Sequence, residues 1–168
     1  AVAGRYRSQL RDGDMAFRLG TKSLKILGEV HPDLQRVVNL AIQLTDTDFT
    51  VLEGLRSKTR QAQLVAAGSS KTMDGRHLTG HAVDLGAWID NKVSWDWDHY
   101  YKIATAMKRA AAQLNIPIVW GGVWDKSLAS LGDPRAAVAS YVASRKAMGR
   151  AAFIDGPHFE LQRSEYPA

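Results

Sequence analysis

The spacing of the apolar residues changes repeatedly along this chain of 168 residues, and this change restricts the folds that it can adopt. Leu34, Val37, Val38 and Ala41 recur at intervals of three and four residues, which predicts a helix. Short runs of β-branched and aromatic residues lie between such stretches and predict strands. Strands mixed with helices, without a regular strand–helix–strand alternation, indicate an α+β domain with a small antiparallel sheet flanked by helices.

Proline, glycine and capping residues mark where these elements begin and end. Pro32 lies where a first helical turn favours proline, and Ser57 can cap a helix that Gly68 closes. Pro117 follows a long amphipathic stretch and ends it. The expected helices span residues 32–44, 58–67, 96–114 and 134–150, and the expected strands span 48–55, 81–89, 118–120 and 159–161.

The length is that of one domain with a single core. Residues 1–14 are polar and aperiodic, so we expect an N-terminal tail, with Met15 as a natural start and residues 15–168 as the domain. The N-terminal segment lacks the apolar region of a signal peptide. No apolar run approaches the roughly 20 residues that cross a bilayer.

Cysteine is absent, so any metal site must use histidine, aspartate or glutamate. The net charge of +5 favours polyanionic partners, among them nucleic acid and the acidic polymers of bacterial cell wall. The basic residues are spread along the chain without a dense cluster or a nucleic-acid motif, so we expect no nucleic-acid partner.

Two histidines and one aspartate form the most informative constellation. His77, Asp84 and His158 could supply three ligands to a zinc ion and leave a fourth position for water, which is the arrangement of a catalytic site. Gly80 would let the backbone turn between the first two ligands. On a strand, residues 81 and 84 point to opposite faces, so His81 is not expected to be a ligand.

Residues 75–84 resemble the Ser-x-His-x-x-Gly-x-Ala-x-Asp motif of zinc peptidases that cleave bacterial cell-wall peptides. That family includes D-Ala-D-Ala carboxypeptidases and dipeptidases, and the L-alanyl-D-glutamate endopeptidases that serve as bacteriophage endolysins. Residues 30–34, 53–56, 120–122 and 157–161 also resemble the endolysin branch in order and spacing. The resemblance covers roughly residues 15–162.

The resemblance implies a role for each matching residue. His77, Asp84 and His158 match the zinc ligands, and Asp155, three residues before the last ligand, matches the general base. Arg56 matches an arginine that holds substrate or stabilises the developing oxyanion.

Three side chains outside the motif are further candidates. Trp120 and Trp124 could shape the wall of the cleft, where Trp120 would bind substrate, or both could belong to the core. Glu160 could be a partner of a metal ligand or an edge-strand charge.

The sequence also departs from the family pattern. Gly75 replaces the leading serine of the motif, and the base is an aspartate where several relatives have glutamate. The segment between Trp124 and Phe153 is longer than in compact endolysins, so we expect a helical insert at about residues 126–152. Its helix carries basic residues and could make weak contact with an anionic membrane or wall surface, or could simply cover the domain.

The function implied is a monomeric zinc endolysin that cleaves the L-alanyl-D-glutamate bond of peptidoglycan by metal-activated water. Such an enzyme is made in the cytoplasm of the host bacterium and acts on the cell wall after release. The nearest alternative is a D-Ala-D-Ala carboxypeptidase of the same family. An alternative of another class is an inactive wall-binding module, and a basic nucleic-acid-binding protein is a third.

Overall fold

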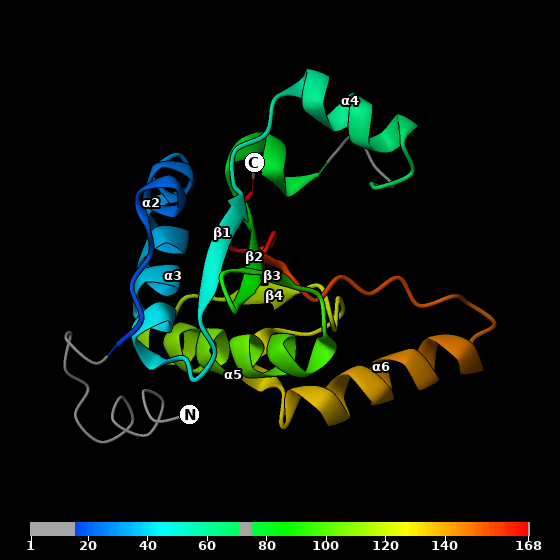
Figure 1. Ribbon diagram of the computed structural model, residues 1–168. Helices are drawn as coiled ribbons and strands as arrows, with labels where there is room; N and C mark the ends of the chain where they lie inside the picture. The colour runs from blue at the N-terminus through cyan, green and yellow to red at the C-terminus, as the bar shows by residue number, and fades with distance from the viewer. Residues whose placement is uncertain (1–15, 71–74, 168) are drawn as a thin grey trace.

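The computed structural model describes residues 16–70 and 75–167, which form one antiparallel sheet with helices packed beside it (Figure 1). The strands run in the order β1-β2-β5-β4, and β3 pairs with β2. The strands are β1 (Phe49–Glu53), β2 (Ala82–Ile89), β3 (Lys92–Ser94), β4 (Ile118–Trp120) and β5 (His158–Leu161). The α-helices are α2 (Thr21–Leu27), α3 (Pro32–Leu44), α4 (Lys58–Ala66), α5 (Trp97–Leu114) and α6 (Pro134–Ala147), and the 3₁₀ turns are η1 (Arg76–Thr79) and η2 (Leu128–Ser130). The predicted α+β architecture with a small antiparallel sheet is confirmed.

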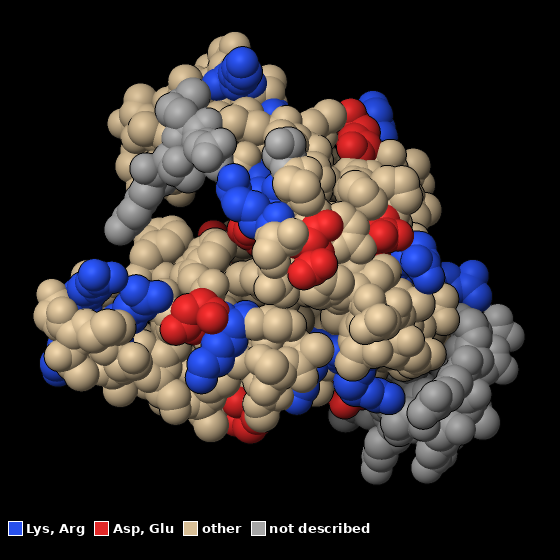
Figure 2. Space-filling view, turned by 180° about the vertical axis from the view of Figure 1, so that it is seen from behind, with Lys and Arg blue, Asp and Glu red and all other residues tan. Residues whose placement is uncertain are grey.

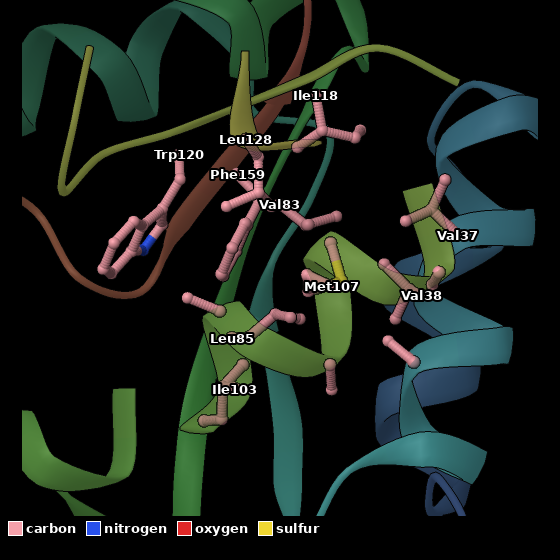
Figure 3. Close-up of a cluster of buried hydrophobic side chains, with 14 of the residues drawn as sticks. Val37, Val38, Val83, Leu85, Ile103, Met107, Ile118, Trp120, Leu128 and Phe159 are labelled. Carbon is pink, nitrogen blue, oxygen red and sulfur yellow. The ribbon is translucent and has the colours of Figure 1, made fainter. Parts of the chain in front are cut away.

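The core lies between the sheet and the helices α3 and α5 (Figure 3). Val83 and Leu85 of β2 are fully buried there, as are Phe159 of β5 and Ile103 and Met107 of α5. Alternate residues of a strand point to opposite faces, so the apolar residues of β2 and β5 share the face that meets these helices. Asp84, between Val83 and Leu85, therefore lies on the other face of the sheet.

The predicted ends of the elements agree closely with the structure. Ser57 caps α4 by accepting a hydrogen bond of 3.0 Å from the Arg60 backbone N–H. Asn115 ends α5 in the left-handed conformation, with φ 55°. Gly80 ends η1 with φ 74°, which confirms the tight turn predicted between the first two candidate ligands.

Two elements were not predicted from the pattern. Helix α2 has only seven residues and depends on tertiary contacts, since Ser23 Oγ lies 2.6 Å from Thr50 Oγ1 and accepts from the Val51 N–H at 2.9 Å. Strand β3 has three residues and follows a turn in which Asp90 and Asn91 have φ of 53° and 63°. Elements this short contain too few residues to display a period.

Helix α6 packs against the domain through one side. Pro134, Val138 and Tyr141 are buried, and the guanidinium of Arg135 lies 4.5 Å from the centre of the Tyr101 ring on α5. The buried side of α6 therefore covers part of the domain, whereas the wall contact remains a prediction.

The tail expected at residues 1–14 lies outside the described residues. Among the residues that are described, no helix combines the length and apolar character needed to cross a membrane.

Replacing Leu34 by alanine tests the core. Leu34 is fully buried, so we expect Leu34→Ala to lower the free energy of unfolding by about 2–5 kcal/mol. Leu24 on α2 is 52% exposed and offers the same substitution as a control, with an expected change within about 0.5 kcal/mol. Urea unfolding followed by circular dichroism measures both, and equal losses would contradict this description of the core.

Candidate metal centre

The structure brings the three predicted ligands together on the open face of the sheet. Asp84 and His158 are cross-strand partners in the pairing of β2 with β5, and His77 comes from η1 just before β2. Oδ1 of Asp84 lies 3.2 Å from His77 Nε2 and 3.2 Å from His158 Nδ1. One ligand atom from each residue lies within 4.8 Å of the other two. Three donors this close can share one ion.

The orientation of both imidazole rings suits coordination. His77 Nδ1 lies 2.8 Å from the Gly54 carbonyl oxygen, which can only accept, so Nδ1 carries the proton and Nε2 is left to face Asp84. His158 Nε2 lies 2.8 Å from Glu160 Oε1, which leaves Nδ1 facing the Asp84 carboxylate. Metal-binding histidines are usually held in this way, with the second ring nitrogen bonded to a carbonyl or a carboxylate. The donor set, two nitrogens and one oxygen without sulfur, suits zinc.

The charges at the site favour an ionised aspartate. Burial works against ionisation of Asp84, but hydrogen bonds from His158 and His77 hold its pKa well below the usual range. Burial likewise opposes the charged form of His158, but hydrogen bonds to Asp84 and Glu160 raise its pKa to about 10. Because imidazole coordinates in its neutral form, a metal ion bound here would take the place of the proton between His158 and Asp84.

Asp155 lies in the cavity that the three ligands line. Burial, followed by the negative charge of Asp84, raises the pKa of its carboxyl. Its backbone is fixed beside β4, where the Asp155 N–H donates to the Gly121 carbonyl at 2.8 Å. A Cβ atom at position 121 would lie only 2.2 Å from the Asp155 carbonyl oxygen, so this close approach requires glycine.

Arg56 is held beside the candidate ligands by two side chains, Glu53 and Gln61. It forms an ion pair with Glu53, and its Nη1 donates to Gln61 Oε1 at 2.8 Å. Its Nη2 lies 3.5 Å from Oδ2 of Asp84, the oxygen that does not contact the histidines. The guanidinium therefore borders both the ligand carboxylate and the cavity.

The site opens into a cavity of about 470 Å³. The molecule is hollowed on this face between α4 and α6 (Figure 2). The cavity is lined by Glu53, Arg56, Gln61, Leu64, Ser69, Ser70, Gly75, Arg76, His77, Asp84, Trp124, Phe153, Asp155, His158, Glu160 and Arg163. Apolar, cationic and anionic side chains all meet there, and a peptide carries groups complementary to each.

The two tryptophans have different environments. Trp120 is fully buried, its Nε1 donates to the Gly156 carbonyl at 2.7 Å, and it is not among the cavity-lining residues. It therefore holds the loop next to Asp155 and has no exposed surface for a substrate. Trp124 lines the cavity, with its ring centre 5.1 Å from that of His158.

Some functional neighbours were not predicted from the sequence. Gln61 and Phe153 line the site, and nothing in the order of residues identifies them. Glu160, by contrast, was a candidate from the sequence; it lies two residues after His158, shares its strand face and bonds to its ring at 2.8 Å. His81 bonds to Thr79 Oγ1 through Nδ1 at 2.7 Å and is not one of the three clustered ligands, as predicted.

A sheet that carries two imidazoles and a carboxylate at one point, with a further carboxyl in the same cavity, is an arrangement suited to a metal-dependent hydrolase. Residues 15–162 match the family described as phage L-alanyl-D-glutamate peptidase, and the chain belongs to that family.

Individual relatives agree with this assignment. An L-alanyl-D-glutamate peptidase of Escherichia phage T5 is 34% identical over 117 residues, which are 67% of this chain and 85% of that protein. One of Listeria phage A118 is 31% identical over 77 residues, or 46% of this chain and 26% of that protein. The crystal structure of Serratia marcescens L-Ala D-Glu endopeptidase ChiX has a TM-score of 0.70 and 40% identity, covering 93% of this chain and 98% of that one.

The close approach at Gly121 can be tested directly. We expect Gly121→Ala to push Asp155 out of place and to lower kcat by about 100-fold, since a displacement of about 1 Å at a catalytic group has effects of this size. Gly132 has no atom within 4 Å of an added Cβ, so Gly132→Ala is the matched control. Peptidoglycan turnover by the two variants measures the difference, and similar rates would show that Asp155 need not be placed by this contact.

Proposed function

We propose that this protein is a zinc endopeptidase that cleaves the L-alanyl-D-glutamate bond in the stem peptide of bacterial peptidoglycan. The observation that carries the proposal is the assembly of His77, Asp84 and His158 around one point, with Asp155 in the same cavity. Membership of the peptidase family and the activity named for the relatives support the choice of bond.

His77, Asp84 and His158 would hold the zinc ion, which would supply Lewis acidity to polarise the scissile carbonyl and to acidify water. Asp155 accepts a proton from the attacking water at its carboxylate and then donates it to the amino group of the departing D-glutamate residue. A raised pKa suits this exchange, because a buried carboxyl holds the proton more readily than an exposed one.

Arg56 is the proposed partner of the negative charge that develops on the carbonyl oxygen. Its side chain is only 9% exposed and is fixed by Glu53 and Gln61, so it needs little reorganisation during the reaction. The same guanidinium could instead hold a carboxylate of the substrate, in line with either role of the family arginine.

The charge of the chain suits its proposed place of action, the bacterial cell wall. A net charge of +5 favours contact with acidic wall polymers. We further propose that residues 126–152 form an insert within a single domain, that the protein acts as a monomer, and that it reaches the wall from the host cytoplasm.

Digestion of purified peptidoglycan tests the bond specificity. We expect new amino termini on D-glutamate, detected by labelling free amines and identifying the labelled residue by mass spectrometry. Release of free D-alanine would instead indicate a carboxypeptidase.

Removal of metal with a chelator should abolish lysis, and added zinc should restore it. Wall binding without cleavage, unaffected by chelator, would indicate an inactive binding module.

Asp155→Asn tests the proton transfer. The amide cannot accept the proton of water, so we expect kcat to fall by about 100- to 10,000-fold. Zinc affinity should change little, because Asp155 is not one of the three clustered ligands. Turnover and zinc binding are measured on the same preparation, and a variant with normal kcat would exclude Asp155 as the base.

A further inference from the structure

Arg76 is a buried cation that the mechanism above does not use. It lies on η1 directly before His77, and its side chain is only 2% exposed. Its Nη2 donates to the carbonyl oxygens of Leu161 at 3.1 Å and of Tyr166 at 2.6 Å. These bonds join the segment before β2 to the end of β5 and the residues that follow it. A guanidinium so deeply buried is costly unless a negative charge lies near it.

Glu160 contributes a negative charge close to this guanidinium. Arg76 Nε lies 3.9 Å from Glu160 Oε2, and the other oxygen of the same carboxylate, Oε1, lies 2.8 Å from His158 Nε2. Guanidinium, carboxylate and imidazole thus form a continuous row that ends at a metal ligand. Glu160 is itself only 15% exposed, so water does little to screen its interaction with Arg76.

We propose that Arg76 is a positioning residue for the metal site and acts through Glu160 on His158. The carbonyl bonds fix the guanidinium, the charge of the guanidinium attracts the Glu160 carboxylate, and the carboxylate holds the proton of His158 on Nε2. The ring then presents Nδ1 to the metal in the orientation required. This inference rests on the metal site of the proposed function and adds Arg76 to it, as a residue that acts on His158 through Glu160.

The placement of Arg76 also separates this role from substrate binding. Arg76 borders the cavity, so a direct contact with a substrate carboxylate is the competing explanation. Its low exposure and its bonds to two backbone carbonyls direct it toward β5. A positioning residue alters metal affinity in the absence of substrate, whereas a substrate-binding residue alters KM and leaves metal affinity unchanged.

The test compares zinc affinity in Arg76→Gln, Glu160→Gln and the double variant, by competition with a chromophoric chelator. We expect each single variant to bind zinc about 10- to 100-fold more weakly, the usual effect of removing a partner of a ligand. The double variant should bind zinc no more weakly than the weaker of the two single variants, because both substitutions interrupt the same chain of contacts from Arg76 through Glu160 to His158. Arg135→Gln is the matched control, since Arg135 pairs with Asp98 on the surface and should leave zinc affinity unchanged.

Two further measurements keep the test decisive. In the zinc-loaded wild type, the Nε2 proton of His158 should give a slowly exchanging downfield NMR signal that is lost in Glu160→Gln. Arg76→Lys keeps the charge but cannot bond both carbonyls and reach Glu160, so its zinc affinity should lie between those of wild type and Arg76→Gln. If Arg76→Gln does not fold, Arg76→Lys and Glu160→Gln carry the comparison.

If the losses of zinc affinity in the two single variants added up in the double variant, the proposed role of Arg76 would be wrong. It would also be wrong if the Arg76 variants bound zinc as tightly as the wild type. A raised KM with normal zinc affinity would likewise contradict that role and would assign Arg76 to the substrate. If the wild type itself binds no zinc, the proposed function fails, and that result is distinct from a failure confined to the variants.

Discussion

The register between β2 and β5 is the constraint on which the site depends. It places Asp84 directly opposite His158, and side chains of directly opposed residues lie close enough to interact. A shift of β5 by one residue would turn His158 toward the core and would bring Phe159 to the open face. The apolar alternation that packs the sheet against α5 therefore also fixes the two ligands. Folding and metal binding are specified by the same alternating pattern.

The third ligand depends on a different kind of constraint. His77 lies on a 3₁₀ turn outside the sheet, and its backbone carbonyl accepts from the Arg56 N–H at 2.9 Å. Its ring nitrogen Nδ1 bonds to the Gly54 carbonyl, so the segment after β1 sets both the position and the rotation of this ligand. Arg56 is consequently placed beside the metal centre by the backbone that orients His77.

These constraints explain what could be predicted from the sequence. The ligands His77, Asp84 and His158 follow from residue types, spacing and resemblance, and the helices and longer strands follow from apolar period and capping. Trp120 could not be assigned in advance, because composition does not distinguish a core tryptophan from an exposed one. Gln61 reaches Arg56 only because α4 lies over the site, and a contact between different elements leaves no local pattern. Helix α2 likewise depends on Ser23 bonding to β1 rather than on its own sequence.

Basic and acidic side chains alternate across the site, and this order separates Asp155 from the other carboxylates. From Arg76 the row passes through Glu160, His158, Asp84, Arg56 and Glu53, each in contact with the next. Asp155 stands outside the row and has no ion pair among the described residues. Hydrogen bonds from His158 and His77 overcome the effect of burial on Asp84 and hold its pKa well below the usual range. For Asp155, burial and the negative charge of Asp84 outweigh the nearby cationic groups and raise the pKa of its carboxyl. One cavity thus contains a carboxylate suited to binding a cation, Asp84, and a carboxyl suited to carrying a proton, Asp155. Their different environments assign the two roles.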